Sequence, residues 1–415
     1  MKQRASQPSE KEITLPGDIA AARILFILSI SVGVAIIGLG IIWPLIPVYA
    51  LDMGATGFQL GMIIASFNIA RVFANPVSGR LSDRFGRKPF IVAGLFSYAL
   101  VSILYILATD VSSLIMVRFL HGLTSVLVVP VAMALAADIA PDSHLARYMG
   151  SLNMAVMLGL GVGPMLGGII RDTLGMNAAF YTMGILALVT AGGVILLIPR
   201  HPFASDSKTK KAVAPIKDLL KHRVVLGLFF LRLFVASGQG SVYTFLPLLG
   251  IDIGISSSQV GIVLGVNIFL IAVLQRACAG IADRRDPRLL IILGTVVSGL
   301  AVFAMPYAKG FVMILILNII MGAANGISTP AGFVLTGQVG RKMGMGSIMG
   351  LTDAGWSLGM IVSPVFSGIV MDSLGLPSIF FIGGILIMIG SIVIFAFLRN
   401  LSEDGSTEVR TTEPQ

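Results

Sequence analysis

The sequence carries an internal repeat with a fixed offset of 200 residues, and this feature constrains the fold more than any other. Identical residues recur at this offset, as in the pairs Pro47 and Pro247, Gly61 and Gly261, Asp83 and Asp283, Gly122 and Gly322, Pro164 and Pro364, and Asp172 and Asp372. One register holds without a gap across six long apolar stretches. Because six is even, both copies insert into a membrane with the same orientation, as parallel repeats about an axis along the membrane normal.

Twelve apolar stretches in all are long enough to cross a bilayer as helices, which takes about 20 residues each. The chain of 415 residues is 56% hydrophobic and 12% charged, with a mean hydropathy of +0.94, whereas soluble domains are roughly 25% charged. The apolar residues do not alternate as they do in membrane barrels. The sequence therefore predicts an all-α membrane protein with twelve transmembrane helices in two pseudo-symmetric six-helix halves. The expected spans are 23–50, 57–79, 88–108, 111–137, 145–171, 178–198, 223–249, 257–279, 288–307, 310–335, 345–371 and 377–398.

These spans divide the chain into an N-terminal tail, two halves, a basic linker and a C-terminal tail. The expected boundaries are 1–22, 23–198, 199–222, 223–398 and 399–415. In a twelve-span arrangement with the N-terminus inside, four of the 29 Lys and Arg residues lie within spans. Only Arg171 and Lys309 then fall on the outside. Because short loops rich in Lys and Arg stay inside, we expect both termini to be cytoplasmic in the cell membrane of a bacterium or archaeon.

The segment between the second and third spans reads GRLSDRFGRK and holds four cations, one carboxylate and two glycines in ten residues. A bilayer core does not accommodate such a charge density, so the segment is expected to form a short aqueous loop. The pattern resembles the signature loop of the major facilitator superfamily, G-x-L-x-D-R-x-G-R-K. The alternative is that the loop is basic only because it lies on the cytoplasmic side and has no further role. The second copy, at 279–288, keeps Asp283 and Arg284 but has Ala279 and Asp286 in place of the two glycines, so the cytoplasmic gates of the two halves are expected to be unequal.

The end of the fourth span, with Asp138, Pro141 and Arg147, also resembles the pattern of this family. The resemblance implies that these charges and the signature loop form a network that closes the cytoplasmic side, with Asp83 facing the start of the eleventh span. The alternative for Asp138 is a helix-end carboxylate in water, which contributes little. The gate residues implied are Gly79, Asp83, Arg84, Gly86, Arg87, Lys88, Asp138 and Arg147.

The fifth span carries Gly159, Gly163, Pro164, Gly167 and Gly168. This arrangement resembles the G-x-x-x-G-P-x-x-G-G motif of drug:proton antiporters within the same family, which points to export. Glycines at these spacings allow close helix contact, and the proline bends the helix. Family architecture implies that this face packs against the eighth span.

Several polar residues lie within spans that the family architecture places around a central cavity, namely spans 1, 4, 7 and 10. These cavity candidates are Arg118, His121, Arg232, Gln239, Asn318 and Asn325. Arg118 also begins an R-x-x-x-G pattern that resembles the one this family has in its fourth span. The alternative for each residue is a structural hydrogen bond between helices.

Asp353 is the only carboxylate expected deep within a span, since the first span lacks the acid that many exporters have. It is therefore the candidate for proton coupling by elimination. Arg71 and Asp353 each lie eight residues from the cytoplasmic end of their spans, about 12 Å deep at 1.5 Å per residue. Family architecture places these spans side by side, so we predict an ion pair that protonation of Asp353 would weaken. A permanent pair, or no contact, is the alternative.

The predicted function is secondary active transport by alternating access, with proton-coupled efflux of small hydrophobic or amphipathic compounds as the first hypothesis. Transport of an organic anion or lipid-like acid, and a non-transporting sensor or scaffold, remain alternatives. The expected partners are a small-molecule substrate, protons and the bilayer, and the chain is expected to work as a monomer. The net charge of +9 collects in loops, so no nucleic-acid partner is expected.

The sequence favours neither an enzyme nor a metalloprotein. It has no phosphate-binding loop, and its four histidines and one cysteine lack the spacing of metal ligands. No metal or other cofactor is therefore expected, and a proton gradient is the expected source of energy.

Overall fold

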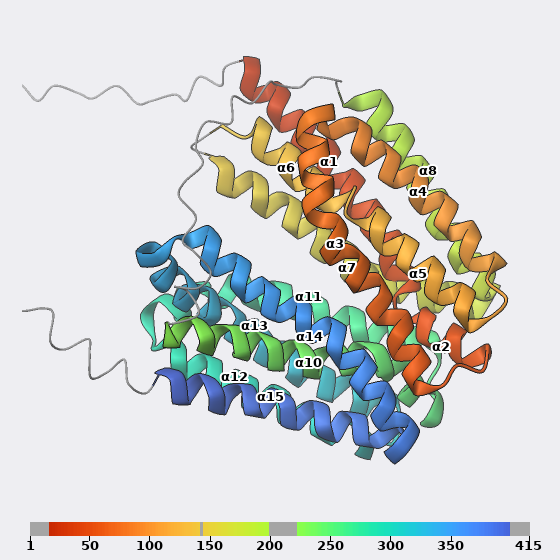
Figure 1. Ribbon diagram of the computed structural model, residues 1–415, viewed down its shortest axis with the longest axis vertical. Helices are drawn as coiled ribbons and strands as arrows, with labels where there is room; N and C mark the ends of the chain where they lie inside the picture. Colours follow the sequence, from red (N-terminus) through yellow and green to blue (C-terminus); the bar gives the residue numbers. More distant parts are fainter. Residues whose placement is uncertain (1–15, 142–143, 199–221, 399–415) are drawn as a thin grey trace, which may run out of the picture.

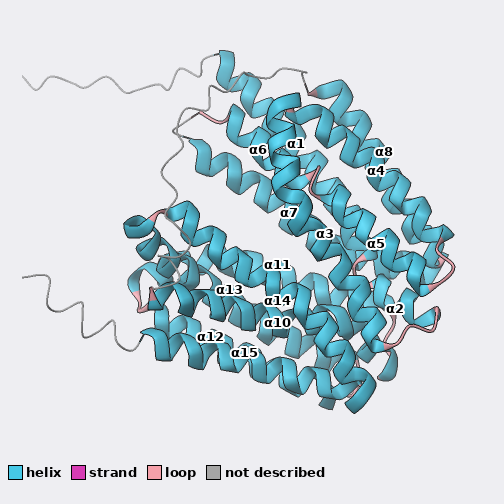
Figure 2. Cartoon of the chain, in the orientation of Figure 1, coloured by secondary structure: helices cyan, strands magenta, loops and turns pink. Residues whose placement is uncertain are grey.

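The computed structural model describes residues 16–141, 144–198 and 222–398. Residues 1–15, 199–221 and 399–415, which include most of the two predicted tails and the predicted linker, lie outside the described residues. The described part consists of helices and short connections, without strands (Figures 1 and 2).

The helices of the N-terminal half are α1 (Pro16–Ile42), α2 (Leu45–Asp52), α3 (Gly57–Phe85), α4 (Arg87–Leu107), α5 (Val111–Ser125), α6 (Val129–Ile139), α7 (Leu145–Leu174) and α8 (Met176–Leu197). Those of the C-terminal half are α10 (Arg223–Asp252), α11 (Ser257–Arg284), α12 (Pro287–Ala304), the short 3-10 helix η2 (Met305–Tyr307), α13 (Phe311–Met343), α14 (Met345–Leu374) and α15 (Leu376–Leu398).

Twelve helical segments of the described chain are long and apolar enough to cross a membrane, so the predicted number of spans is confirmed. Two spans of the N-terminal half are broken, the first between α1 and α2 and the fourth between α5 and α6. A proline ring clashes with the carbonyl group four residues earlier. The rings of Pro47 and Pro130 therefore clash with the carbonyl groups of residues 43 and 126, which is where the two helices break. The equivalent Pro247 and Pro330 lie within continuous helices.

The two halves pack their helices in the same way, as the repeat requires. In the N-terminal half α1 contacts α7 and α8, while α3 contacts α5 and α4 contacts α8. The equivalent contacts in the C-terminal half are those of α10 with α14 and α15, of α11 with α13, and of α12 with α15. Two equivalent pairs, α3 with α14 and α7 with α11, join the halves (Figure 1).

The halves meet at one end of the bundle and part toward the other. Within the described residues, hydrogen bonds between the halves join 57–68 to 360–372 and 171–172 to 257–258. We call the end that carries Gly79–Lys88 the loop end, and the end where these bonds concentrate the opposite end. In Figure 1 the two groups of helices converge near α2 and diverge toward the left of the view.

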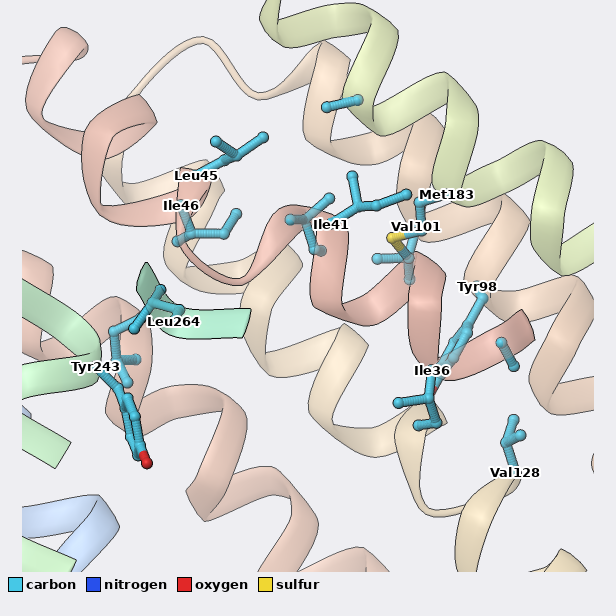
Figure 3. Close-up of a cluster of buried hydrophobic side chains, with 14 of the residues drawn as sticks. Ile36, Ile41, Leu45, Ile46, Tyr98, Val101, Val128, Met183, Tyr243 and Leu264 are labelled. Carbon is cyan, nitrogen blue, oxygen red and sulfur yellow. The ribbon is translucent and has the colours of Figure 1, made fainter. Parts of the chain in front are cut away.

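A buried apolar cluster extends from the N-terminal half into the C-terminal half. Figure 3 shows Leu45 and Ile46 of α2 together with Tyr243 of α10 and Leu264 of α11, all of which belong to this cluster. The contact of α2 with α10 explains why the cluster is continuous. The halves therefore share a hydrophobic core near the opposite end.

Candidate functional site

Two carboxylates hold the halves together at the opposite end. The backbone N–H groups of Gly57 and Phe58, at the start of α3, donate to the two carboxylate oxygens of Asp372 at 2.7 and 2.9 Å. At the equivalent place, the N–H and hydroxyl groups of Ser258 donate to Asp172 Oδ2 at 2.7 and 2.6 Å. The first N–H groups of a helix have no partner within it and carry partial positive charge. The repeat therefore builds the same clamp twice.

Next to these clamps, glycines bring the helices of the two halves into backbone contact. A Cβ atom at Gly168 of α7 would collide with the Ser257 carbonyl of α11, and one at Gly61 of α3 would collide with the Pro364 carbonyl of α14. The predicted packing of the fifth span against the eighth is thus present. Small residues at both seams let the helix backbones approach.

The sequence prediction was wrong for three of the motif glycines, Gly159, Gly163 and Gly167. Gly163 and Gly167 face α1 of their own half. An added Cβ at Gly163 would lie 2.6 Å from Gly40 Cα, and one at Gly167 would collide with the Ile41 carbonyl. Gly159 faces α1 as well. Residues 159, 163 and 167 share one helix face through their spacing of four, and only Gly168 of the predicted glycines turns toward α11. The motif therefore serves two contacts at once.

A central cavity of about 400 Å³ lies between the halves, and helices of the C-terminal half form most of its wall. The N-terminal half contributes Trp43, Asn153, Met157 and Leu160. The rings of Trp43 and Tyr243 meet across the halves at a centroid distance of 5.3 Å. Since the clamps lie beyond these rings, the cavity is closed toward the opposite end.

The cavity wall contains one ion pair. Arg232 Nη2 of α10 lies 3.3 Å from Asp353 Oδ1 of α14, and the guanidinium group lies over the ring of Trp356 at 4.9 Å. The Arg232 side chain is 29% exposed and that of Asp353 is 70% exposed. Both residues line the central cavity. The carboxylate is therefore the more accessible of the two charges.

The predicted ion pair between Arg71 and Asp353 does not form in this conformation. Asp353 pairs instead with Arg232 of its own half, and the guanidinium group of Arg71 lies 5.7 Å from the ring of Phe67 on its own helix. The prediction that α3 and α14 are neighbours is correct. The two residues nevertheless lie on the loop-end side of the Asn68–Met360 hydrogen bond, where the halves part.

The remaining cavity candidates divide into two groups. Gln239 and Asn325 line the cavity together with Arg232. Asn318 is fully buried, and its side chain donates to the Ile314 carbonyl at 3.0 Å. Arg118 and His121 are buried in the N-terminal half and are not among the residues that line the cavity.

Arg118 and His121 belong to an aromatic cluster of the N-terminal half. Tyr105 Oη lies 2.9 Å from His121 Nδ1 and accepts a hydrogen bond from Arg118 Nη1 at 3.4 Å. The guanidinium group also lies 4.7 Å from the centre of the Phe67 ring. A desolvated arginine is stabilised by an aromatic face. These contacts favour the structural alternative for both residues.

At the loop end, Arg87 joins several of the predicted gate residues. It pairs with Asp83 and with Asp138, whose Oδ2 lies 3.0 Å from Arg87 Nε, and it donates to Ser82 Oγ at 2.7 Å. The Lys88 ammonium donates to the Ile195 carbonyl at 2.8 Å, near the end of α8. This network ties α3, α4, α6 and α8 together within the N-terminal half.

The other gate residues have separate positions. Gly86, with φ of +93°, is the single residue between α3 and α4, so the predicted loop is almost entirely helical. Gly79 has open space beside it, and Arg84 lies over the ring of Phe85. Arg147 is at the start of α7. The contact of Asp83 with the eleventh span, around 344–346, requires a closed loop end and stays a prediction.

The sequence missed several cavity residues, among them Trp43, Asn153, Tyr243, Gln275 and Phe333. Trp43 and Tyr243 are related by the repeat offset, and this aromatic pair was the available signal. No group of three potential metal ligands occurs among the described residues.

Twelve membrane-crossing helices in two parallel halves, with a cavity between them, define a polytopic membrane transporter. The chain belongs to the Major Facilitator Superfamily, whose family model matches residues 28–285 and 228–414. Its members are transporters and not enzymes.

Three relatives match almost the whole chain. An uncharacterized MFS-type transporter, MJ1560, of Methanocaldococcus jannaschii is 30% identical over 380 residues, which is 90% of this chain and 97% of the relative. Multidrug resistance protein 2 of Bacillus subtilis is 26% identical, over 88% of this chain and 93% of the relative. The quinolone resistance protein NorA of Staphylococcus aureus is 23% identical, over 84% and 90%.

Solved structures show the same fold. A bacterial homologue of the human lysosomal transporter Spinster, in an inward-facing and occupied conformation, matches with a TM-score of 0.79 at 14% identity, over 95% of this chain and 99% of that one. The nucleoside transporter NupG matches with a TM-score of 0.77 at 13% identity, over 91% and 99%. At these identities the likeness concerns the fold alone.

Proposed function

We propose that this transporter exports small amphipathic organic cations in exchange for protons, by alternating access. The observation that carries the proposal is Asp353, a carboxylate in the wall of the central cavity with 70% of its side chain exposed. Arg232 is less accessible, and its guanidinium group lies over the ring of Trp356 at 4.9 Å. A ligand that enters the cavity therefore meets the negative charge first, and this arrangement favours a cation.

The rest of the cavity wall suits an amphipathic molecule. Trp43, Tyr243, Phe333 and Trp356 supply aromatic surface, which binds both apolar groups and organic cations. Asn325 also lines the cavity, and its buried Nδ2 atom has no hydrogen-bond partner among the described residues. The names of two relatives, a multidrug resistance protein and a quinolone resistance protein, support export of such compounds.

Coupling follows if a proton and the cation compete for Asp353. We place the loop end in the cytoplasm, since most Lys and Arg residues lie on that side. The cavity then faces inward, where Asp353 releases its proton and binds the cation. After the halves rock about their seams, a proton from outside displaces the cation. The proton gradient supplies the energy, and one chain contains the whole cavity and is expected to work as a monomer.

Exchange of an organic anion is the second candidate function. It rests on Arg232, which also lines the cavity and would bind a carboxylate or sulfonate. In this case a substrate anion would replace Asp353 as the partner of Arg232.

The test uses purified protein in proteoliposomes with an imposed pH gradient and ethidium as the cationic probe. The wild type should accumulate ethidium on the acidic side of the membrane. Asp353→Asn should abolish this accumulation. Asp252→Asn is the matched control, since this carboxylate lies at the exposed end of α10 and outside the cavity.

Three results would overturn the proposal. Gradient-driven ethidium transport that survives in Asp353→Asn would place proton coupling elsewhere. Gradient-driven transport of a sulfonated dye, with none of ethidium, would establish the anion function instead. If neither dye nor any other small compound moves, the sensor or scaffold alternative is favoured.

A further inference from the structure

A second cavity, of about 460 Å³, lies on the side of the molecule where α7 and α11 bring the two halves together. It is lined by Gly150, Asn153, Met154, Met157, Leu158, Phe269, Ala272, Gln275, Arg276, Pro330, Phe333 and Val334. We call it the side cavity. Four of these residues also line the central cavity, so the two spaces adjoin.

The side cavity begins where the glycine seam between α7 and α11 ends. Going from the opposite end, the seam runs through Gly168 and reaches Gly161, where an added Cβ would lie 3.0 Å from the ring of Phe269. Phe269 is also the first residue of α11 in the wall of the side cavity. The next turns of α7 toward the loop end contribute Leu158 and Met154. The cavity is therefore the lateral part of the space between the parted halves.

Apolar side chains in this wall are exposed at a depth where the bilayer surrounds the protein. Met154 is 53% exposed, Leu158 49% and Phe333 50%. Exposing apolar surface to water costs about 25 cal/mol per Å². An acyl chain covers the same surface without that cost, so a lipid chain is the favoured occupant.

One arginine of the C-terminal half lines this cavity toward the loop end, and one of the N-terminal half lies a helical turn beyond its lining residues. Arg276 lines the cavity and lies two residues before the end of the apolar segment Ser257–Cys278. Arg147 begins the segment Arg147–Leu174 and precedes Gly150, which also lines the cavity, by one helical turn on the same face. Within the described residues neither arginine has an ion-pair partner, and no carboxylate lines the cavity.

Lipid headgroups lie at the loop-end boundary of these apolar segments, where long arginine side chains reach the interface. Basic pockets between transmembrane helices on the cytoplasmic side bind anionic headgroups. Because the wall contains a cation and no acid, a zwitterionic headgroup gains less from it than an anionic one.

We propose that the side cavity binds an anionic phospholipid of the surrounding bilayer. Its phosphate group lies between Arg147 and Arg276, and one acyl chain follows Met154, Leu158 and Phe269. A lipid in this position bridges the two halves and fills the lateral opening beside the central cavity. The proposal is independent of the transported substrate.

The test is native mass spectrometry of the full-length protein, purified in detergent and mixed with equal amounts of phosphatidylglycerol and phosphatidylcholine that have identical chains. The wild type should retain phosphatidylglycerol preferentially. Since each cation near the membrane surface contributes roughly a fivefold preference, Arg276→Gln and Arg147→Gln should each lower the preference by about that factor. Arg285→Gln is the matched control, because Arg285 is exposed beyond the end of α11.

A second variant tests the position of the acyl chain. Leu158→Trp fills the cavity from an exposed site and should reduce retention of both lipids while leaving the preference between them unchanged. Equal retention of the two lipids by the wild type would overturn the proposal. An unchanged preference in both arginine variants would also overturn it, even if lipid binds elsewhere on the protein.

Discussion

Trp43 and Tyr243 occupy equivalent positions in the two halves, and their rings meet between the halves at a centroid distance of 5.3 Å, with planes inclined by 53°. Both rings line the central cavity. Asp172 and Asp372, which are also equivalent, bind helix N-termini farther toward the opposite end. Two layers of symmetric contacts therefore close the cavity on this side, and both must break when the halves rock.

The clamp carboxylates provide the first prediction. Asp372→Ala removes the acceptor of two N–H groups of α3 and should favour opening of the opposite end. Hydrogen bonds to charged groups contribute about 1.5–3 kcal/mol. The measurement is the rate at which an impermeant maleimide labels Gln239→Cys in a Cys278→Ser background. The maleimide is added on the side of the membrane that carries the opposite end. Labelling should be at least severalfold faster in the Asp372→Ala protein.

The control for this clamp is Asp252→Ala, which removes an exposed carboxylate at the same end that makes no hydrogen bond or ion pair with the other half among the described residues. Asp172→Ala should act as Asp372→Ala does, and the double variant should be roughly additive, because the two clamps share no partner. Equal labelling rates in all variants would mean that the clamps do not limit opening.

The glycines of α7 provide the second prediction, because they face different helices. Gly163→Leu forces α7 away from α1 within one half and should lower the melting temperature, since overpacking costs about 1–3 kcal/mol. Gly168→Leu acts at α11 instead and should speed labelling of Gln239→Cys from the opposite side. Gly192→Leu is the control, since an added Cβ there meets nothing within 4 Å. Identical behaviour of the two α7 variants would contradict the assignment of faces.

The number of helices and the parallel halves were predictable because the repeat holds one register, and hydropathy marks each span. The neighbouring pairs α3 with α14 and α7 with α11 were also predictable, from the resemblance to the family. The rotation of each helix about its axis was not. For this reason the sequence placed Gly163 and Gly167 toward α11, although they face α1.

The partner of Asp353 could not be found by matching depths alone. Arg71 and Arg232 lie at similar depths along the membrane normal, so depth does not decide which of them pairs with Asp353. The pairing depends on which helices stay together when the halves part. α10 and α14 belong to one half and remain in contact, so that Arg232 is the neighbour. A rigid half preserves its internal pairs, while pairs between halves depend on the conformation.

The aromatic cluster of the N-terminal half provides the third prediction. Tyr105→Phe removes the hydroxyl group shared by Arg118 and His121. Buried polar groups that lose a partner cost about 1–3 kcal/mol, so the melting temperature should fall while ethidium binding is unchanged. Tyr307→Phe, at an exposed ring, is the control. Loss of ethidium binding at full stability would assign the cluster to the transport site after all.

The last prediction concerns Arg232, whose removal frees the carboxylate that the proposed cation uses. Exposed ion pairs contribute roughly 0.2–1 kcal/mol, so Arg232→Gln should tighten ethidium binding, by up to about fivefold. In Asp353→Asn ethidium binding should be weak, because the carboxylate that the proposed cation uses is absent. Fluorescence titration of the purified wild type and both variants measures the binding, and weaker ethidium binding by Arg232→Gln would favour the anion function.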